Sequence, residues 1–366
     1  MYILLVVFYS VVGIQLLYLI VFLSGLSRNR SGKSSSALPV SVIVCAHDEE
    51  HNLRTLIPQL LEQQYPQFEI IIVNDRSNDG TYDFLLEETK KNPRLRMVHV
   101  DRVPAHVNGK KFGITLGIKA ASYEWILLSD ADSRPASPNW IAQMSSQFGE
   151  QTQFVLGFSP YRKQPGLLNL FIRFETLITA VQYFSFALLR NPYMGVGRNL
   201  AYRKSLFLEK KGFNQFLSVT GGDDDLFVNQ HATGKNTNVE LSAESQVYSF
   251  PKTTWGSFFN QKIRHLSVGK RYRMKHRILL GVFTLTWIMT WFAGVALLGV
   301  DITNWPVAAA LGVRIILLLI LVRSIVKKTQ SPFELWVVPF LDFIYSIYYI
   351  STGLVALLTK KVRWRK

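Results

Sequence analysis

Four acidic clusters carry side chains that could bind a cation or accept a proton. Three follow directly after apolar runs and the fourth lies far downstream: His47-Asp48-Glu49-Glu50, Asn74-Asp75-Arg76-Ser77, Ser129-Asp130-Ala131-Asp132 and Gly222-Asp223-Asp224-Asp225. An extended backbone places Asp130 and Asp132 on one side, so this pair could hold a hard divalent cation against a diphosphate. Three consecutive aspartates repel one another, which raises at least one pKa and suits a general base. Taken alone, the first pattern is also typical of a solvated turn, and the second of an acidic loop or helix N-cap.

The elements that must position these clusters alternate between strand and helix. Spacing and composition predict strands at Val40–Val44, Glu69–Val73, Leu95–Val100 and Trp125–Leu128, and helices at Asn52–Gln64, Tyr82–Lys91 and Phe112–Ala121. This alternation predicts an α/β fold with a doubly wound, mostly parallel sheet, and the nearly continuous apolar strands fit burial on both faces. Ligands of such sheets bind beyond the carboxyl ends of the strands, which is where the first three clusters fall.

An apolar stretch at the N-terminus predicts a membrane anchor. Residues Tyr2 to Leu26 contain 25 positions without a charge, which at about 1.5 Å per residue spans a bilayer core. Basic residues follow this stretch and none precedes it, so we interpret it as a retained anchor and not as a cleaved signal peptide. The positive-inside rule then places the N-terminus outside and the next residues in the cytoplasm.

Three further apolar stretches lie near the C-terminus. Ile278–Val300 and Trp305–Val322 predict two spans. The last stretch, Phe333–Leu358, contains Pro339 and Asp342. We expect it to be broken or re-entrant, because that arrangement would return the basic residues 360–366 to the cytoplasm.

The formal net charge of +16 lies mostly beside these apolar stretches. Basic residues without any acid occupy the windows 28–33, 261–277, 323–328 and 360–366, and the rest of the chain is close to neutral. Anionic lipid headgroups and the positive-inside rule both call for this distribution, which argues against a nucleic-acid partner. The single cysteine, Cys45, excludes an internal disulfide and fits a reducing cytoplasmic location.

Three regions follow from these boundaries. They are an N-terminal transmembrane anchor at 1–27, a cytoplasmic domain at 38–275 and a C-terminal membrane region of two to three spans at 278–359. Ser31–Ala37 is a linker of small residues. Within the central domain, Leu167–Leu189 has apolar side chains at helical spacing and many aromatic residues. We favour a helix lying in the membrane surface over a core helix for this segment.

The predicted sheet region resembles a known enzyme family. The strings VSVIVCAHDEE, EIIIVNDRSNDGT, NGKKFG and WILLSDADSRP are similar in order, spacing and residue type to the family 2 glycosyltransferases. The resemblance covers about residues 38–275 and points to the membrane-bound branch, with its ceramide glucosyltransferase-like and synthase-like inverting enzymes. It implies a Rossmann-like domain of the GT-A type that binds a nucleotide-sugar.

The resemblance also implies roles for single residues around that donor. Residues of the nucleotide-sugar site would be Ala46, His47, Glu49, Asp75, Lys110 and Asp130. Ala46 and His47 would line the base pocket, although the family often has Tyr where this chain has His47. Asp75 would accept a hydrogen bond from the base, Asp130 would contact the nucleoside, and Asp132 would ligate Mg²⁺ or Mn²⁺.

Later motifs extend the resemblance to the acceptor side. Gly221-Gly222-Asp223-Asp224-Asp225-Leu226 resembles the E-D-x-D-L element, with Gly222 where the family often has Glu. This match makes Asp223 the catalytic base, which takes the proton of an acceptor hydroxyl as that hydroxyl attacks the anomeric carbon opposite the nucleotide.

Two other segments are assigned to the donor site in the same way. Gln261-Lys262-Ile263-Arg264-His265 resembles the Q-x-x-R-W signature, with His265 in place of Trp. Arg264 would pair with the diphosphate, because its planar fork suits two oxygens, and Gln261 would accompany it. Gly195–Tyr202 resembles the segment that closes over the donor sugar and contributes Asn199.

The resemblance therefore implies an inverting, metal-dependent glycosyltransferase that uses a UDP-sugar, with a GDP-sugar as the less favoured donor. We expect a lipid acceptor, such as a polyprenyl phosphate, diacylglycerol, hopanoid or carotenoid. A processive polysaccharide synthase remains an alternative, although such channels usually bring more spans. A non-catalytic membrane scaffold would be expected to lack Asp75, Asp132 or Asp223, and all three are present. A dinucleotide-dependent oxidoreductase is excluded because Cys45-Ala46-His47-Asp48 follows the first strand in place of G-x-G-x-x-G.

Overall fold

Residues 1–28 and 37–358 are described by a computed structural model, in which the chain divides into two units. The sheet unit comprises Arg30–Arg162 and Ala187–Pro251, and the membrane unit comprises Met1–Asn29, Lys163–Phe186 and Lys252–Lys366. Most of the predicted linker and all of the basic residues 360–366 lie outside the described residues. Each unit is built from elements that the residue pattern favours.

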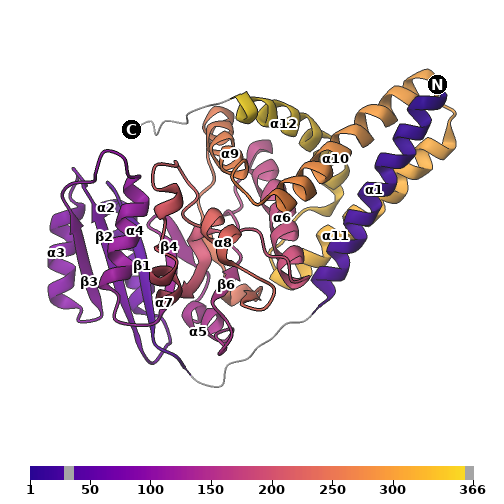
Figure 1. Cartoon of the computed structure of the whole chain (residues 1–366). Coiled ribbons are helices and arrows are strands. Elements are labelled where there is room, and N and C mark those ends of the chain that lie inside the picture. The colour runs from indigo at the N-terminus through magenta and orange to yellow at the C-terminus, as the bar shows by residue number, and fades with distance from the viewer. Residues whose placement is uncertain (29–36, 359–366) are drawn as a thin grey trace. The chain divides into compact units, whose positions relative to one another are not determined.

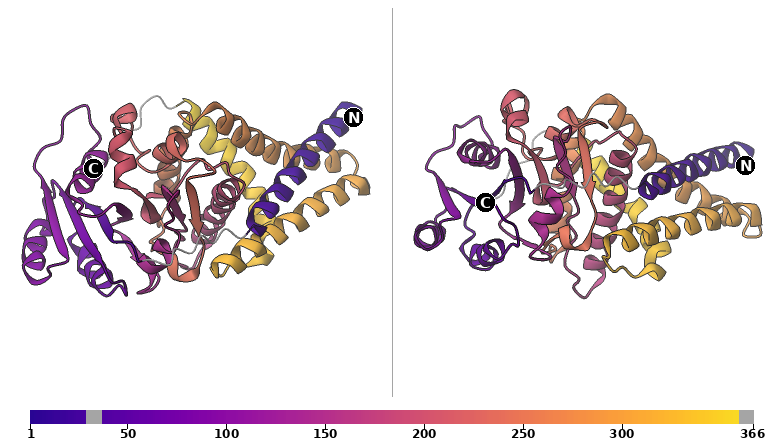
Figure 2. Two further views of the ribbon diagram at one scale, coloured as in Figure 1. Left: turned by 60° about the horizontal axis from the view of Figure 1, so that its bottom comes forward. Right: turned by 90° about the horizontal axis from the view of Figure 1, so that it is seen from below.

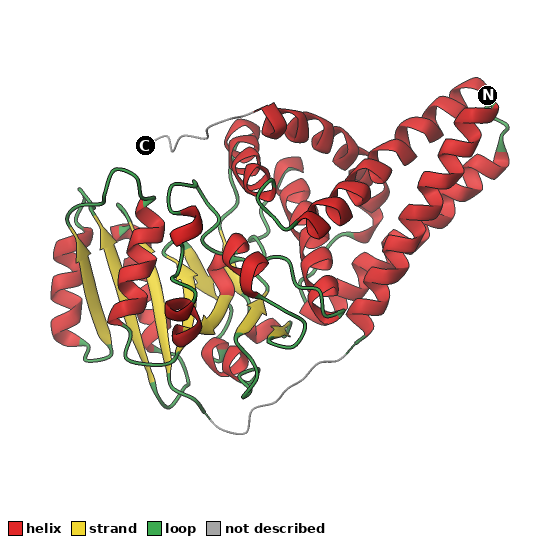
Figure 3. Cartoon of the chain, viewed as in Figure 1, coloured by secondary structure: helices red, strands yellow, loops and turns green. Residues whose placement is uncertain are grey.

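Strands of the sheet unit form one mixed sheet in the order β3-β2-β1-β4-β7-β6-β8. These strands are β1 (Val40–Ala46), β2 (Phe68–Asp75), β3 (Leu95–Val100), β4 (Trp125–Asp130), β6 (Phe154–Gly157), β7 (Leu200–Arg203) and β8 (Thr237–Glu240). β1 runs parallel to β2 and β4, and β2 runs parallel to β3, whereas β7 is antiparallel to β4 and β6. A separate antiparallel pair is formed by β5 (Ser133–Pro135) and β9 (Val247–Ser249). The predicted α/β class is confirmed, and Figure 3 shows the strands flanked by helices.

Helices cover this sheet because their apolar side chains recur at helical spacing. The helices and short turns are α2 (Glu50–Leu61), α3 (Thr81–Lys91), α4 (Gly109–Ala120), α5 (Trp140–Ser145), α7 (Lys204–Glu209), α8 (Asp225–His231), η1 (Gly197–Asn199), η2 (Asn214–Phe216) and η3 (Ala243–Ser245). Leu53, Leu56, Ile57 and Leu60 of α2 are buried in the core beneath the sheet. α4 packs on β1 and β2, and α3 packs on β3 (Figure 1). This packing fixes the carboxyl ends of β1, β2 and β4, where the first three acidic clusters begin.

The membrane unit contains helices that are long and apolar enough to cross a bilayer. Among the described residues four segments qualify: α1 (Tyr2–Ser27), α10 (Met274–Val300), α11 (Trp305–Thr329) and the segment Leu335–Val355, which spans η4 (Leu335–Val337) and most of α12 (Val338–Leu358). α1 lies alongside α10 and α11 for much of its length (Figure 2). Nε2 of Gln15 in α1 donates to the carbonyl of Phe283 at 2.8 Å and to Thr286 Oγ1 at 2.7 Å. Buried hydrogen bonds of this kind hold helices together where lipid supplies no hydrophobic drive.

A buried ion pair joins α11 to α12. The guanidinium of Arg314 donates to both carboxylate oxygens of Asp342, and both side chains are fully buried. Nε1 of Trp291 donates to Asp342 at 3.1 Å, and the ring of Trp287 lies 4.7 Å from the Arg314 guanidinium carbon. α12 is a continuous helix with Pro339 in its first turn, where the missing N–H removes no helical bond. Pro339 and Asp342 therefore do not break this helix, although we expected a broken or a re-entrant segment. That the segment is re-entrant stays a prediction.

The helix predicted at Leu167–Leu189 is α6 (Leu167–Leu188). Its aromatic side chains are buried, including Phe171, Phe174, Tyr183 and Phe184. Within the membrane unit, Phe171 and Phe174 contact Tyr345 of α12, and Phe171 also contacts Phe258 of α9 (Trp255–Gly269). An interfacial helix would turn these rings toward lipid. The structure thus favours the core-helix interpretation over the membrane-surface interpretation.

Candidate active site

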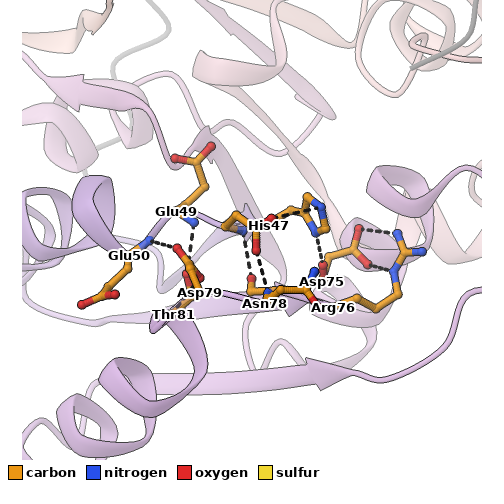
Figure 4. Close-up of polar contacts among 10 residues, drawn as sticks. His47, Glu49, Glu50, Asp75, Arg76, Asn78, Asp79 and Thr81 are labelled. Carbon is orange, nitrogen blue, oxygen red and sulfur yellow. Dashed lines mark hydrogen bonds and ion pairs between the residues drawn. The ribbon is translucent and has the colours of Figure 1, made fainter. Parts of the chain in front are cut away.

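The turn after β1 is held against the turn after β2 by short polar contacts (Figure 4). Nδ1 of His47 donates to the backbone carbonyl of Asp75. Asp48 has a positive φ of 57°, which turns its carboxylate to accept from the N–H of Asn78 at 2.6 Å. Ala46, at the end of β1, is almost completely buried. The two predicted base-pocket turns are therefore adjacent, and His47 is the exposed residue between Ala46 and the acids.

Asp75 occupies the end of β2 beside the start of α4. Its carboxylate accepts from Arg76 Nε at 2.7 Å and from the Arg76 terminal nitrogen at 3.2 Å. A Cβ at Gly109 would lie 2.8 Å from an Asp75 oxygen and 2.6 Å from the Arg76 guanidinium, so a larger residue there would have to displace these side chains. The first turn of α4 consequently approaches Asp75 closely enough for one ligand to contact both.

Lys110 connects the ends of two acidic clusters. Its Nζ lies 2.8 Å from Oδ1 of Asp130 at the end of β4 and 3.5 Å from Oδ2 of Asp223. Burial alone would lower the pKa of Lys110, but Asp130 and Asp223 hold it well above its ordinary value. Lys110, Asp130 and Asp223, which come from three distant motifs, therefore lie close together.

The carboxylates around Asp132 suit a hard cation. Asp132 is exposed and lies two residues beyond the end of β4, and Glu49 lies at the end of the turn after β1. Burial, followed by the charges of Asp132 and Asp130, raises the pKa of Glu49. In the described part of the chain, no group of three or more His, Cys, Asp and Glu side chains is arranged to hold a metal by itself. Mg²⁺ and Mn²⁺ need only one or two carboxylates when phosphate oxygens and water complete the shell, so these residues fit such an ion.

The three consecutive aspartates have different surroundings. The Asp224 side chain accepts from the N–H of Asp225, where it caps α8, and from the N–H of Gly197 at 2.7 Å. Burial and the charge of Asp223 raise the pKa of Asp224. Burial would also raise the pKa of Asp223, but Lys110 and Lys111 outweigh it and hold this pKa below its ordinary value. The raised pKa that we expected for one of the three aspartates therefore belongs to Asp224, which caps α8. Asp223 carries a charged carboxylate.

The segment predicted to close over the donor sugar presents Arg198 where we had singled out Asn199. The Asn199 amide is buried and donates to the carbonyls of Phe158 and Ser245, while its oxygen accepts from Trp140 Nε1. The Arg198 guanidinium lies 4.8 Å from the ring centre of Tyr161. Burial would lower the pKa of Arg198, but Tyr161, Asp130 and Asp132 raise it, which places this cation near both strand-end acids. Sequence reasoning missed Arg198, although it lies inside the Gly195–Tyr202 segment that carried the signal.

Gln261 and Arg264 lie in the membrane unit, on α9. Their neighbour Lys262 forms an ion pair with the buried carboxylate of Glu175 on α6. α9 also packs along α12. The roles of Gln261 and Arg264 at the diphosphate stay predictions.

Comparison with protein families matches nearly the whole chain to one family. The model of glycosyl transferase family 21 matches residues 5–366. Curated relatives include the poly-β-1,6-N-acetyl-D-glucosamine synthase of Staphylococcus epidermidis, 35% identical over 95 residues, which are 26% of this chain and 22% of the relative. The probable glycosyltransferase YdaM of Bacillus subtilis is 25% identical over 236 residues, 62% of this chain and 54% of the relative. The chain thus spans from about a fifth to about half of the length of these relatives.

Solved structures resemble the whole chain in fold. The mannosyltransferase PcManGT from Pyrobaculum calidifontis, solved in complex with GDP-Man and Mn²⁺, is similar with a TM-score of 0.66 at 17% sequence identity. The match covers 98% of this chain and 99% of that one. At this level of identity the likeness concerns the fold alone.

Proposed function

This chain belongs to glycosyl transferase family 21, and from that premise we propose that it transfers one sugar from a nucleotide-sugar to a lipid acceptor at the membrane surface. The family makes it a glycosyltransferase of the GT-A type, as predicted. The observation that carries the finer proposal is the bridge of Lys110 between Asp130 and Asp223. It supports a single site in which the donor residues and the proton acceptor work on the same sugar.

The donor enters at the carboxyl ends of β1, β2 and β4. His47 and Ala46 bound the base, Asp75 accepts a hydrogen bond from the base edge, and Asp130 faces the nucleoside beside Lys110. Glu49 lies near the diphosphate end with Asp132. A UDP-sugar is the proposed donor, and a GDP-sugar is the alternative, which the likeness to a mannosyltransferase solved with GDP-Man supports. The buried Asn199 anchors its segment through its hydrogen bonds to Phe158 and Ser245. The adjacent Arg198 supplies a cation near the phosphates.

A divalent cation fits beside Asp132, with Glu49 and Asp130 as the nearest further carboxylates. When bound, Mg²⁺ or Mn²⁺ neutralises the charge that develops on the leaving nucleoside diphosphate. The Mn²⁺ of the similar mannosyltransferase supports this choice. Arg198 would add positive charge for the same phosphate oxygens.

Asp223 removes the proton of the acceptor hydroxyl. Its carboxylate is charged because Lys110 and Lys111 lower its pKa, and it has little exposure to solvent. A single displacement from the face opposite the nucleotide inverts the anomeric centre, and Asp223 needs only one hydrogen bond to the attacking oxygen. Asp224 is committed to the cap of α8, which leaves Asp223 as the carboxylate for this role.

The acceptor is proposed to be a lipid because the chain joins its sheet unit to a membrane unit. In the part of the chain that the structure describes, four helices are long and apolar enough to span a bilayer, and α9 carries basic residues that lead into α10. Basic residues near a membrane each contribute about 1 kcal/mol of attraction to anionic headgroups. The positive-inside rule supports a cytoplasmic position for the sheet unit.

A processive polysaccharide synthase is the second candidate. The 95 residues shared with the poly-β-1,6-N-acetyl-D-glucosamine synthase favour it, although they cover only 26% of this chain. The two candidates differ in their products, since a synthase releases a polymer whereas a single transfer gives a glycolipid.

The deciding experiment incubates membranes that contain the full chain with a panel of radiolabelled nucleotide-sugars and chromatographs the product. We expect label in the organic phase, as one species that is one sugar heavier than the acceptor. Membranes with Asp223→Asn serve as the control and should show label reduced by about 10²-fold or more. A water-soluble ladder of high molecular weight would identify a synthase, and no transfer from any donor would overturn the proposal.

A further inference from the structure

Lys111 follows Lys110 on α4 but turns away from the strand ends. Its side chain is fully buried, and its Nζ donates to the backbone carbonyls of Val219 and Gly221. The ring of Phe216 lies 5.7 Å from the same ammonium group. All of these partners belong to the loop that runs from η2 to Asp223, so one lysine contacts the loop along most of its length.

Within this loop the N–H of Val219 donates to the carbonyl of Phe216 at 3.1 Å, and two glycines allow the chain to turn before Asp223. Gly221 and Gly222 have φ values of 83° and 82°, a backbone region that side chains other than glycine rarely adopt. A further contact with α4 comes from the N–H of Asn108, which donates to the carbonyl of Leu217 at 2.9 Å. A buried ammonium group needs hydrogen-bond acceptors, and Lys111 finds two of them in these carbonyls, whose direction it thereby fixes.

The two adjacent lysines therefore divide their contacts. Lys110 reaches carboxylate oxygens of Asp130 and Asp223, whereas the Lys111 ammonium donates to main-chain carbonyls that precede Asp223. Burial lowers the pKa of Lys111, while Asp223, Asp224 and Asp225 oppose that shift. The charges of the aspartate run thus help to keep an ammonium group in a buried place.

We propose that Lys111 is a positioning residue that holds the Asp223 carboxylate at the reaction centre by fixing the loop 217–222 on the N-terminal turn of α4. The proposal rests on the proposed function, because it takes Asp223 as the proton acceptor. Lys111 itself touches no reacting group. Its effect passes through the Val219 and Gly221 carbonyls to the direction in which the chain enters Asp223.

The test compares Lys111→Met with Lys119→Met in the full chain reconstituted in bilayers. Both replace a lysine of α4, but Lys119 is exposed. Hydrogen exchange is followed in peptides that cover residues 213–224 and, as an internal reference, in peptides of β1 and β2. We expect Lys111→Met to speed exchange in 213–224 and leave the reference peptides and Lys119→Met unchanged.

Kinetics supply the second readout. A misplaced proton acceptor should reduce kcat by about 10²-fold with little change in the KM for the donor. Lys111→Arg, which retains a cation, should recover part of this loss, and it replaces Lys111→Met in both measurements if the methionine variant does not fold. Unchanged exchange in 213–224, or an equal loss in kcat and donor affinity, would overturn the positioning role. If the unmodified chain transfers no sugar, the proposed function fails, and the exchange result alone still decides whether Lys111 holds the loop.

Discussion

Nζ of Lys110 lies 2.8 Å from Oδ1 of Asp130, which ties the first turn of α4 to the end of β4. The same ammonium lies 3.5 Å from Asp223 on a loop more than 90 residues away in the sequence. Without it, two carboxylates would face one another beside a ligand that is itself negatively charged.

Lys110→Met should therefore weaken both donor binding and turnover. Because the variant leaves the buried Asp223 and the partly exposed Asp130 without their cation, we expect kcat/KM for the donor to fall by about 10²-fold or more. Calorimetric titration with the donor and steady-state rates measure the two effects. Lys119→Met is the control on the same helix, and normal donor affinity in Lys110→Met would contradict the bridge.

Asp132→Asn should abolish binding of the donor in the presence of Mn²⁺ or Mg²⁺. The amide keeps the shape of the side chain but removes the charge that a hard cation requires. Donor titrations with and without metal measure this loss, and Asp83→Asn on exposed α3 is the matched control. Full activity of the unmodified protein in a strong chelator would refute the metal requirement.

Asp223→Asn should reduce turnover by about 10²–10⁴-fold while donor affinity changes little. Asp225→Asn, two residues further along the same cluster, should have a smaller effect. The Asp225 carboxylate already accepts from the N–H of Leu226 at the start of α8. If donor affinity collapses together with turnover, Asp223 belongs to the donor site. The pH profile adds a check. Because the pKa of Asp223 lies below the ordinary value of about 4, this base is charged at every pH above that value, and the rate should show no acid limb from it there.

Glu69 provides a prediction about stability. Its buried carboxylate accepts from Ser41 Oγ at 2.6 Å, from Arg96 at 2.8 Å and from the N–H of Ser122. Burial would raise the pKa of Glu69, but these bonds outweigh burial and lower it. Since the folded pKa lies below the unfolded value of about 4.3, this stabilisation is complete above that pH and is lost as the pH falls through the folded pKa.

Glu69→Gln should accordingly lower the free energy of unfolding at neutral pH by about 1–3 kcal/mol. Thermal unfolding of the variant and of Glu87→Gln, an exposed acid on α3, measures the difference. The gap between Glu69→Gln and the unmodified chain should shrink on acidification. A gap that stays constant down to pH 3 would show that the carboxylate charge is not what stabilises the sheet.

The first half of the sheet could be predicted from sequence because its signals are local. β1 to β4 and the helices between them follow from apolar runs and helical spacing, and all begin or end within a few residues of their expected positions. The later strands β6, β7 and β8 are only four residues each and pair out of chain order, so no local pattern identified them. Their pairing depends on contacts between distant segments.

The candidate site was predictable in residue type more than in detail. Motif order singled out Asp130, Asp223 and Lys110, but the bridge among them depends on how α4 sits against two loops. The buried place of Asn199 and the approach of Arg198 to the acids could not be read from a glycine-containing string, because they depend on contacts with Trp140, Phe158 and Tyr161 elsewhere in the chain. The different surroundings of Asp223 and Asp224 likewise arise from the Gly197 N–H and from Lys111, which tertiary packing supplies.

The ion pair between Arg314 and Asp342 has a consequence for biogenesis. Arg314 lies in the middle third of α11, and its insertion into a bilayer without a counter-charge would cost about 2.5–3.5 kcal/mol. Ribosomes deliver α11 before α12, so the nascent helix is poorly suited to lipid until Asp342 emerges. Helix α12 thus supplies the counter-charge that lets α11 insert stably. A chain that ends after α11 would present an unpaired guanidinium to the quality-control machinery of the membrane.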